Sequence, residues 1–167
     1  MLGKSHVILS EAILLPIALN TQYSNFFSKG YGITNPIYFI IGVALGALLP
    51  DIDEKNSILG RFNPFASLIK HRTITHTLWM ALLISIIFLI IGMHSPFCWG
   101  IILGYWAHLI EDSFSRKGIS WLYPFISHKH NNHYGYITGG IFEKIVVFMA
   151  FLFIIFTIFK RIFKFLF

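Results

Sequence analysis

Three short polar motifs interrupt an otherwise apolar chain, and each carries side chains that bind metal ions. HRTITH (71–76) contains two histidines, LLPDID (48–53) ends in two aspartates, and HLIED (108–112) pairs a histidine with an aspartate. Imidazole nitrogens and carboxylate oxygens are typical ligands of zinc and other divalent metals. The candidate metal ligands in these motifs are therefore Asp51, Asp53, His71, His76, His108 and Asp112.

In HRTITH, the spacing of the two histidines constrains how they could reach one ion. His71 and His76 are five residues apart, which separates their directions by about 140° on a regular helix. Because Thr73 and Thr75 are good N-cap residues, we expect a helix to begin within the motif, with His76 in its first turn and His71 on the preceding loop. The planar fork of Arg72 suits phosphate or carboxylate, and anchoring to a lipid headgroup is the alternative role.

The other two motifs each have a functional and an ordinary interpretation. His108 and Asp112 are four residues apart, so on a helix they point about 40° apart and can bind one ion. The alternative is that His108 hydrogen-bonds a neighbouring helix. Asp51 and Asp53 follow a proline that ends a helix, where they could bind a metal or belong to a solvated loop.

Further polar residues are weaker candidates. Glu143 lies one turn into the last apolar segment, where it could serve a site or form an ion pair with Lys144. Glu11 could hydrogen-bond to a metal ligand and so orient it, or it could form a hydrogen bond within the core. The cluster HKHNNH (128–133) fits a solvated loop better than a metal site. No sequence motif of a serine hydrolase, nucleotide-binding loop or HExxH protease is present.

The composition indicates a membrane protein. Hydrophobic residues make up 56% of the 167 residues and charged residues 12%, about half the proportion usual in soluble domains. Between Thr73 and Ile110 there is no Asp, Glu, Lys or Arg. The length fits one domain covering residues 1–167. The net charge of +6 does not indicate nucleic-acid binding, because the basic residues flank apolar segments and form no patch with stacking aromatics.

Five apolar segments approach the length of roughly 20 residues that spans a bilayer as a helix. They cover about residues 2–19, 36–49, 77–93, 97–110 and 140–159. We therefore expect an all-α fold, a bundle of four to five transmembrane helices. Gly42 and Gly46 give the second segment a small-xxx-small spacing that lets helices approach closely.

If all five segments span, the connections alternate between the two faces of the membrane. The three motifs, His6 and Glu143 then fall at one face, which predicts a single polar site at one end of the bundle. Of the 13 Lys and Arg residues, nine lie on that side and four on the other, so the positive-inside rule places the site at the cytoplasmic face.

The ordered set GALLPDID, HRTITHTL and GYWAHLIEDSFSRKGISWLYPF resembles a bacterial family of membrane-bound, metal-dependent hydrolases, the family of inner-membrane protein YdjM. The resemblance runs from His6 to about Glu143 and adds His6 as an early ligand. The chain departs from the family pattern at Glu54, where histidine is common, and at Ser115, where threonine is usual. The order of the ligands is more distantly similar to that of zinc-dependent phospholipase C and P1-type nucleases.

The resemblance implies a metal-dependent hydrolase in a bacterial inner membrane. One or two divalent ions, zinc above all, would be bound by His6, Asp51, Asp53, His71, His76, His108 and Asp112. Asp53 or Glu143 would transfer protons, Arg72 would bind an anionic headgroup, and the substrate would be a lipid phosphoester. The alternatives are a hydrolase of amide- or ester-linked lipids, a non-catalytic metal- or lipid-binding membrane protein of a stress response, and a transporter.

Overall fold

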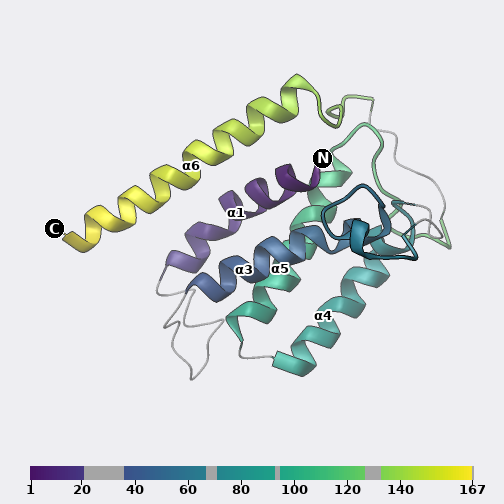
Figure 1. The fold of residues 1–167 in the computed structure, drawn as a ribbon, viewed down its shortest axis with the longest axis horizontal. Coiled ribbons are helices and arrows are strands. Elements are labelled where there is room, and N and C mark those ends of the chain that lie inside the picture. Colours follow the sequence, from purple (N-terminus) through teal and green to yellow (C-terminus); the bar gives the residue numbers. More distant parts are fainter. Residues whose placement is uncertain (21–35, 67–70, 93–94, 127–132, 167) are drawn as a thin grey trace.

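The fold is a bundle of α-helices (Figure 1). A computed structural model describes residues 1–20, 36–66, 71–92, 95–126 and 133–166. Within these ranges it has five α-helices and no β-strand. The helices are α1 (Gly3–Leu19), α3 (Pro36–Leu48), α4 (Leu78–Gly92), α5 (Pro96–Ser113) and α6 (Ile141–Leu166). The all-α prediction is therefore confirmed, and each of the five expected segments corresponds to one helix.

Proline and threonine set several of the helix ends. Pro36 opens α3, and α3 gives way to a 3-10 turn (Pro50–Asp53) that begins with the proline expected to end it. Thr77 begins α4, because its Oγ1 accepts a hydrogen bond from the N–H of Met80 at 3.2 Å. α5 continues beyond its expected end through the HLIED motif, which puts His108 and Asp112 on one regular helix.

α3 and α5 form the tightest helix pair, and glycines make it possible. A Cβ atom added at Gly42 or Gly46 would overlap the backbone of Phe97 or Ile101. A Cβ atom at Gly100 or Gly104 on α5 would in turn overlap backbone atoms of α3. The close approach predicted for Gly42 and Gly46 is thus confirmed, and α5 has a second glycine pair with the same spacing.

This contact predicts a large effect of one methyl group. Gly104→Ala should lower the free energy of unfolding by about 2 kcal/mol, because the neighbouring backbone cannot move aside as a side chain would. Gly3→Ala is the matched control, since its added Cβ would meet the Leu48 side chain at an ordinary 3.5 Å. Thermal unfolding in detergent measures both, and equal melting temperatures for the two variants would contradict the proposed packing.

The remaining helices pack around this pair. α1 lies against α3, and α6 lies along the outer side of α1, while α4 packs on α5 at the opposite edge (Figure 1). Leu14 and Ala18 of α1 pack with Phe39 and Val43 of α3 in one apolar cluster. The connections 49–77 and 114–140, where described, lie at the same end of the bundle as the start of α1 (Figure 1). HRTITH, LLPDID and HLIED therefore all lie at that end.

Among the described residues, two helical stretches, rather than the expected four to five, are long and apolar enough to span a membrane. They are Pro36–Asp53 and Ile141–Lys164. α4 is apolar, but its 15 residues extend only about 22 Å, less than the roughly 30 Å hydrocarbon core. α1 is interrupted by His6 and Glu11, and the last turn of α5 carries two carboxylates.

Candidate metal centre

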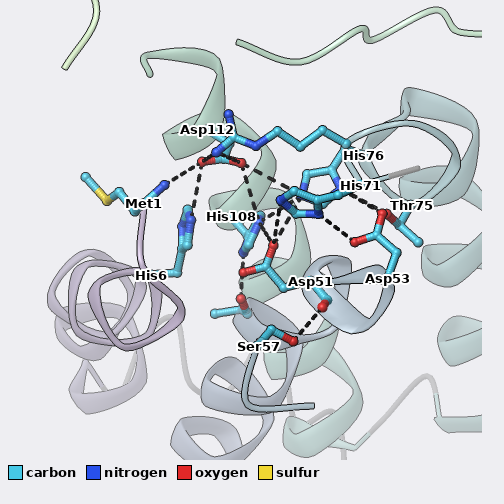
Figure 2. Close-up of polar contacts among 12 residues, drawn as sticks. Met1, His6, Asp51, Asp53, Ser57, His71, Thr75, His76, His108 and Asp112 are labelled. Atoms are coloured by element: carbon cyan, nitrogen blue, oxygen red, sulfur yellow. Dashed lines mark hydrogen bonds and ion pairs between the residues drawn. The ribbon is translucent and has the colours of Figure 1, made fainter. Parts of the chain in front are cut away.

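All seven predicted ligands converge at one end of the bundle, although they come from five different parts of the chain (Figure 2). α1 supplies one, α5 two, the 3-10 turn Pro50–Asp53 two, the 3-10 turn Ile74–His76 one, and the loop before it one. The seven are His6, Asp51, Asp53, His71, His76, His108 and Asp112. Six are buried, and His71 keeps 30% of its side chain exposed, which makes it the open edge of the cluster.

The backbone of HRTITH differs from the sequence-based prediction. Thr73 and Thr75 do not cap a helix; His76 ends a 3-10 turn, and α4 begins two residues later with Thr77 as its cap. The hydroxyl of Thr75 binds the carboxylate of Asp53 instead, at 2.6 Å. The histidines therefore approach the cluster from a loop and from a 3-10 turn, so the 140° of a regular helix does not apply.

On two of the imidazoles, Nδ1 has a fixed partner and Nε2 faces the cluster. Nδ1 of His108 lies 2.7 Å from the carbonyl oxygen of Ala47, which can only accept, so this nitrogen carries the proton. Nδ1 of His6 lies 2.6 Å from a carboxylate oxygen of Glu111. Nε2 of His108 is thereby left with a lone pair, the arrangement usual in histidines that bind metals. Nε2 of His6 faces Asp112.

The other two imidazoles follow the same pattern through Asp53. Nδ1 of His71 lies 2.8 Å from Oδ1 of Asp53. Thr75 donates its hydroxyl proton to Oδ2 of Asp53, so its oxygen is free to accept from Nδ1 of His76 at 2.9 Å. Both oxygens of Asp53 are thus engaged behind the rings, which places this residue as a support of His71 and His76.

The inward-facing atoms have the spacing of metal ligands. Nε2 of His76 lies 3.5 Å from Oδ1 of Asp51, Nε2 of His108 lies 3.6 Å from the same oxygen, and the two nitrogens are 3.3 Å apart. A tetrahedral zinc site with bonds of about 2.0–2.1 Å has ligands about 3.3 Å apart. This triangle therefore matches one face of such a site.

A second set of ligand atoms lies beside the first and shares His108. Nε2 of His6 lies 3.4 Å from Oδ1 of Asp112, and the His6 and His108 rings stack with centroids 3.7 Å apart. His6 Nε2 is buried and has no hydrogen-bond partner. A buried polar atom left in this way indicates a missing partner, and a metal ion would satisfy it.

Asp112 is surrounded by positive charge. Nη2 of Arg72 lies 2.8 and 2.7 Å from its two carboxylate oxygens, and the amino group of Met1 lies 2.7 Å from Oδ1. Burial alone would raise the pKa of Asp112, but the contacts with His6 and with the amino group of Met1 lower it well below its usual range. Asp112 is therefore ionised and available to a cation.

Arg72 and Glu143 have partners other than those expected from sequence. The Arg72 side chain is 7% exposed, and besides Asp112 its guanidinium donates to Ser115 Oγ at 3.1 Å, so the fork that was expected to bind a headgroup is used inside the protein. Glu143 accepts the backbone N–H groups of Leu2 and Gly139, each at 2.9 Å, and so ties α6 to the start of α1.

Sequence reasoning did not single out Glu111. It is buried beside His6 and also accepts a hydrogen bond from Ser10 at 3.0 Å, and burial raises its pKa against the effect of these two bonds. Its position three residues after His108, on the same helix, was the available signal. His133 is exposed and lies outside the metal groups formed by the described residues, whereas His128 and His130 fall outside the described ranges.

Comparison with known proteins assigns the chain to a family. A family model described as YdjM inner membrane protein matches residues 1–166. The chain belongs to this family. The match covers the three motifs and all five described helices, so the predicted resemblance to the YdjM family is confirmed over almost the whole chain. Membership also supports the membrane interpretation of the composition.

A curated relative extends the likeness. The Bacillus subtilis protein named Uncharacterized protein YvsG is 35% identical over 132 residues, a stretch that covers 74% of this chain and 74% of the relative. No solved structure matches the chain at a significant level. The relative establishes kinship, the family description supports membrane association, and the chemistry has to be argued from the cluster itself.

Proposed function

We propose that the cluster binds one or two divalent metal ions, zinc above all, and that the protein is a metal-dependent hydrolase. The observation that carries this proposal is the triangle of Asp51 Oδ1, His76 Nε2 and His108 Nε2, whose edges of 3.3–3.6 Å fit a metal. Mixed imidazole and carboxylate donors favour zinc over magnesium or calcium, which prefer oxygen alone. His6 and Asp112, with His108, would form the second group.

In this proposal, the surrounding residues orient the ligands. Glu111 holds the His6 ring, the carbonyl of Ala47 holds His108, and Asp53 holds His71 and, through Thr75, His76. A bound zinc ion would polarise the substrate and lower the pKa of an attacking water. Such supporting partners typically contribute about 10- to 100-fold in metal affinity.

In this proposal, protons are transferred at His71, the partly exposed edge of the cluster. We assign this transfer to Asp53 acting through His71, because His71 is the part-exposed imidazole and its Nδ1 is already paired with Oδ1 of Asp53 at 2.8 Å. Nε2 of His71 would then exchange protons with the reacting group. Glu143 is further from this role than expected from sequence, since both its oxygens hold backbone N–H groups.

A membrane lipid is the proposed substrate. An apolar groove of about 320 Å³ runs between α1 and α6 beside the cluster, lined by Leu2, Ile8, Val147, Phe148 and Phe151 among others. α6 is one of the two candidate spans, so this groove faces hydrocarbon and suits an acyl chain. A phosphoester bond is favoured because a cluster of cations stabilises phosphoryl charge. We further propose that this end faces the cytoplasm, since it carries most of the Lys and Arg residues.

The proposal is tested by assaying purified, zinc-loaded protein against mixed micelles of three lipids: a phosphatidate, an ester-linked diacylglycerol and an amide-linked ceramide. We expect release of inorganic phosphate from the phosphatidate, and a loss of at least about 100-fold in Asp53→Asn, which disturbs the His71 pair. Glu54→Gln is the matched control and should keep full activity, because Glu54 is half-buried and its carboxylate accepts hydrogen bonds from Asn56.

Other outcomes favour the alternatives. Turnover of the ester or amide lipid alone would replace the phosphoester substrate by that class. Bound zinc with no turnover of any lipid would contradict the enzyme and support a non-catalytic metal- or lipid-binding membrane protein.

A further inference from the structure

We propose that a basic pocket at the far end of the bundle binds the phosphate of an anionic phospholipid. The pocket lies between the C-terminal ends of α1 and α6, with a volume of about 280 Å³. α6 contributes Lys160, Arg161 and Lys164, α1 contributes Leu19, and Asn20 follows directly after α1. The metal cluster lies at the opposite end of the bundle, where α6 begins (Figure 1). The pocket is therefore independent of the function proposed above.

The charge in the pocket is one-sided. Lys160, Arg161 and Lys164 fall within about 100° of one another around α6, so all three can reach the same anion. None of the described residues that line the pocket is acidic. Like charges repel at this spacing, so the three cations are unfavourable next to one another without an anion. An anion bound among the three side chains would be stabilised by all of them, and Arg161 offers the planar fork that matches a phosphate.

The level of the pocket identifies the anion as a lipid. The candidate span Ile141–Lys164 ends at these cations, which puts them at the depth of the headgroups when α6 crosses the bilayer. Phe156, Phe159 and Phe163 are more than half exposed beside them and offer an apolar surface for acyl chains. A phospholipid can therefore contact the cations with its phosphate and the phenylalanines with its acyl chains, whereas a free phosphate can contact the cations alone.

The pocket differs from the other basic surfaces of the described residues because it has an apolar wall as well as positive charge. Pro16 and Leu19 of α1 form an apolar wall opposite the cations, and Asn20 adds an amide. A basic residue near an anionic surface contributes about a fivefold preference. Removing three cations should therefore reduce the preference for anionic over zwitterionic lipid by about 100-fold.

The test uses the full-length protein in neutral detergent and native mass spectrometry with dioleoyl-phosphatidylglycerol or dioleoyl-phosphatidylcholine. The triple variant Lys160→Gln, Arg161→Gln, Lys164→Gln should lose the bound phosphatidylglycerol. The matched control Lys55→Gln, Arg116→Gln, Lys117→Gln makes the same change in charge at exposed positions near the other end, and it should retain the lipid.

Further variants and a competition experiment test whether the loss of lipid is due to the loss of positive charge in the pocket. Lys160→Arg with Lys164→Arg keeps the charge and should bind as the wild type does; if it loses the lipid, charge recognition is wrong. Equal loss in the control triple, or retention in the pocket triple, would overturn the proposal. Displacement of the lipid by millimolar inorganic phosphate would identify a free-anion site instead of a lipid site.

Discussion

His108→Ala should remove the metal from the purified protein. His108 belongs both to the group with Asp51 and His76 and to the group with His6 and Asp112. Its Nε2 lies 3.6 Å from Oδ1 of Asp51 and 3.9 Å from Oδ2 of Asp112. Loss of one shared ligand therefore weakens both positions. We expect a fall in zinc affinity of at least about 100-fold, more than the loss of a supporting residue would cause. Elemental analysis and competition with a chromophoric chelator measure it.

His133→Ala is the matched control, because it removes an exposed histidine from the same end of the molecule. This variant should keep the wild-type metal content. Helix content by circular dichroism separates loss of metal from loss of fold. Wild-type metal in His108→Ala would refute the cluster as the metal site, and metal loss in His133→Ala would place the site on the polar loop.

Arg72→Lys should weaken metal binding by about 10- to 100-fold, although the charge is conserved. Arg72 contacts both oxygens of Asp112 and also the hydroxyl of Ser115, and a lysine ammonium on its flexible stem cannot reproduce this fork. The backbone of Arg72 has φ of 63°, the left-handed region, and Lys meets the same strain there. The substitution therefore isolates the guanidinium.

Arg61→Lys provides the control, because Arg61 is exposed and its guanidinium stacks on the ring of Phe62. It should leave zinc affinity unchanged. If Arg72→Lys instead retains metal and lowers only the turnover of an anionic lipid, Arg72 binds the substrate headgroup as the sequence suggested. In that case, the guanidinium would have to leave Asp112 when the lipid binds.

Residue types and spacings within one element predicted a large part of this molecule. The four-residue spacing of His108 and Asp112 placed both on one helical face, and Gly42 with Gly46 indicated the close helix contact that α3 makes. The alternation of apolar segments placed the polar motifs together at one end. These inferences succeeded because the geometry of a single helix follows directly from residue number.

Contacts between distant elements were not predictable in the same way. The partner of Arg72 is 40 residues away along the chain, and the partner of His6 is 105 residues away. From the sequence, Glu143 was predicted to belong to the site and Glu111 was not singled out. Both carboxylates lie at the ends of apolar helices, so the sequence pattern around them does not tell the two apart. Only the packing of α1 against α5 and α6 distinguishes them.

The sequence by itself determined the all-helical fold, its membrane character and the side chains that form the candidate metal centre. The tertiary structure decided which nitrogen of each imidazole faces inward and which carboxylates support the rings. It also showed that, in the part of the chain that it describes, two helices rather than four or five are long and apolar enough to span a bilayer. The physical reason is that a ligand's type is a property of its residue. Its direction depends on the hydrogen bonds that it makes to neighbouring elements, and these form only when the helices pack.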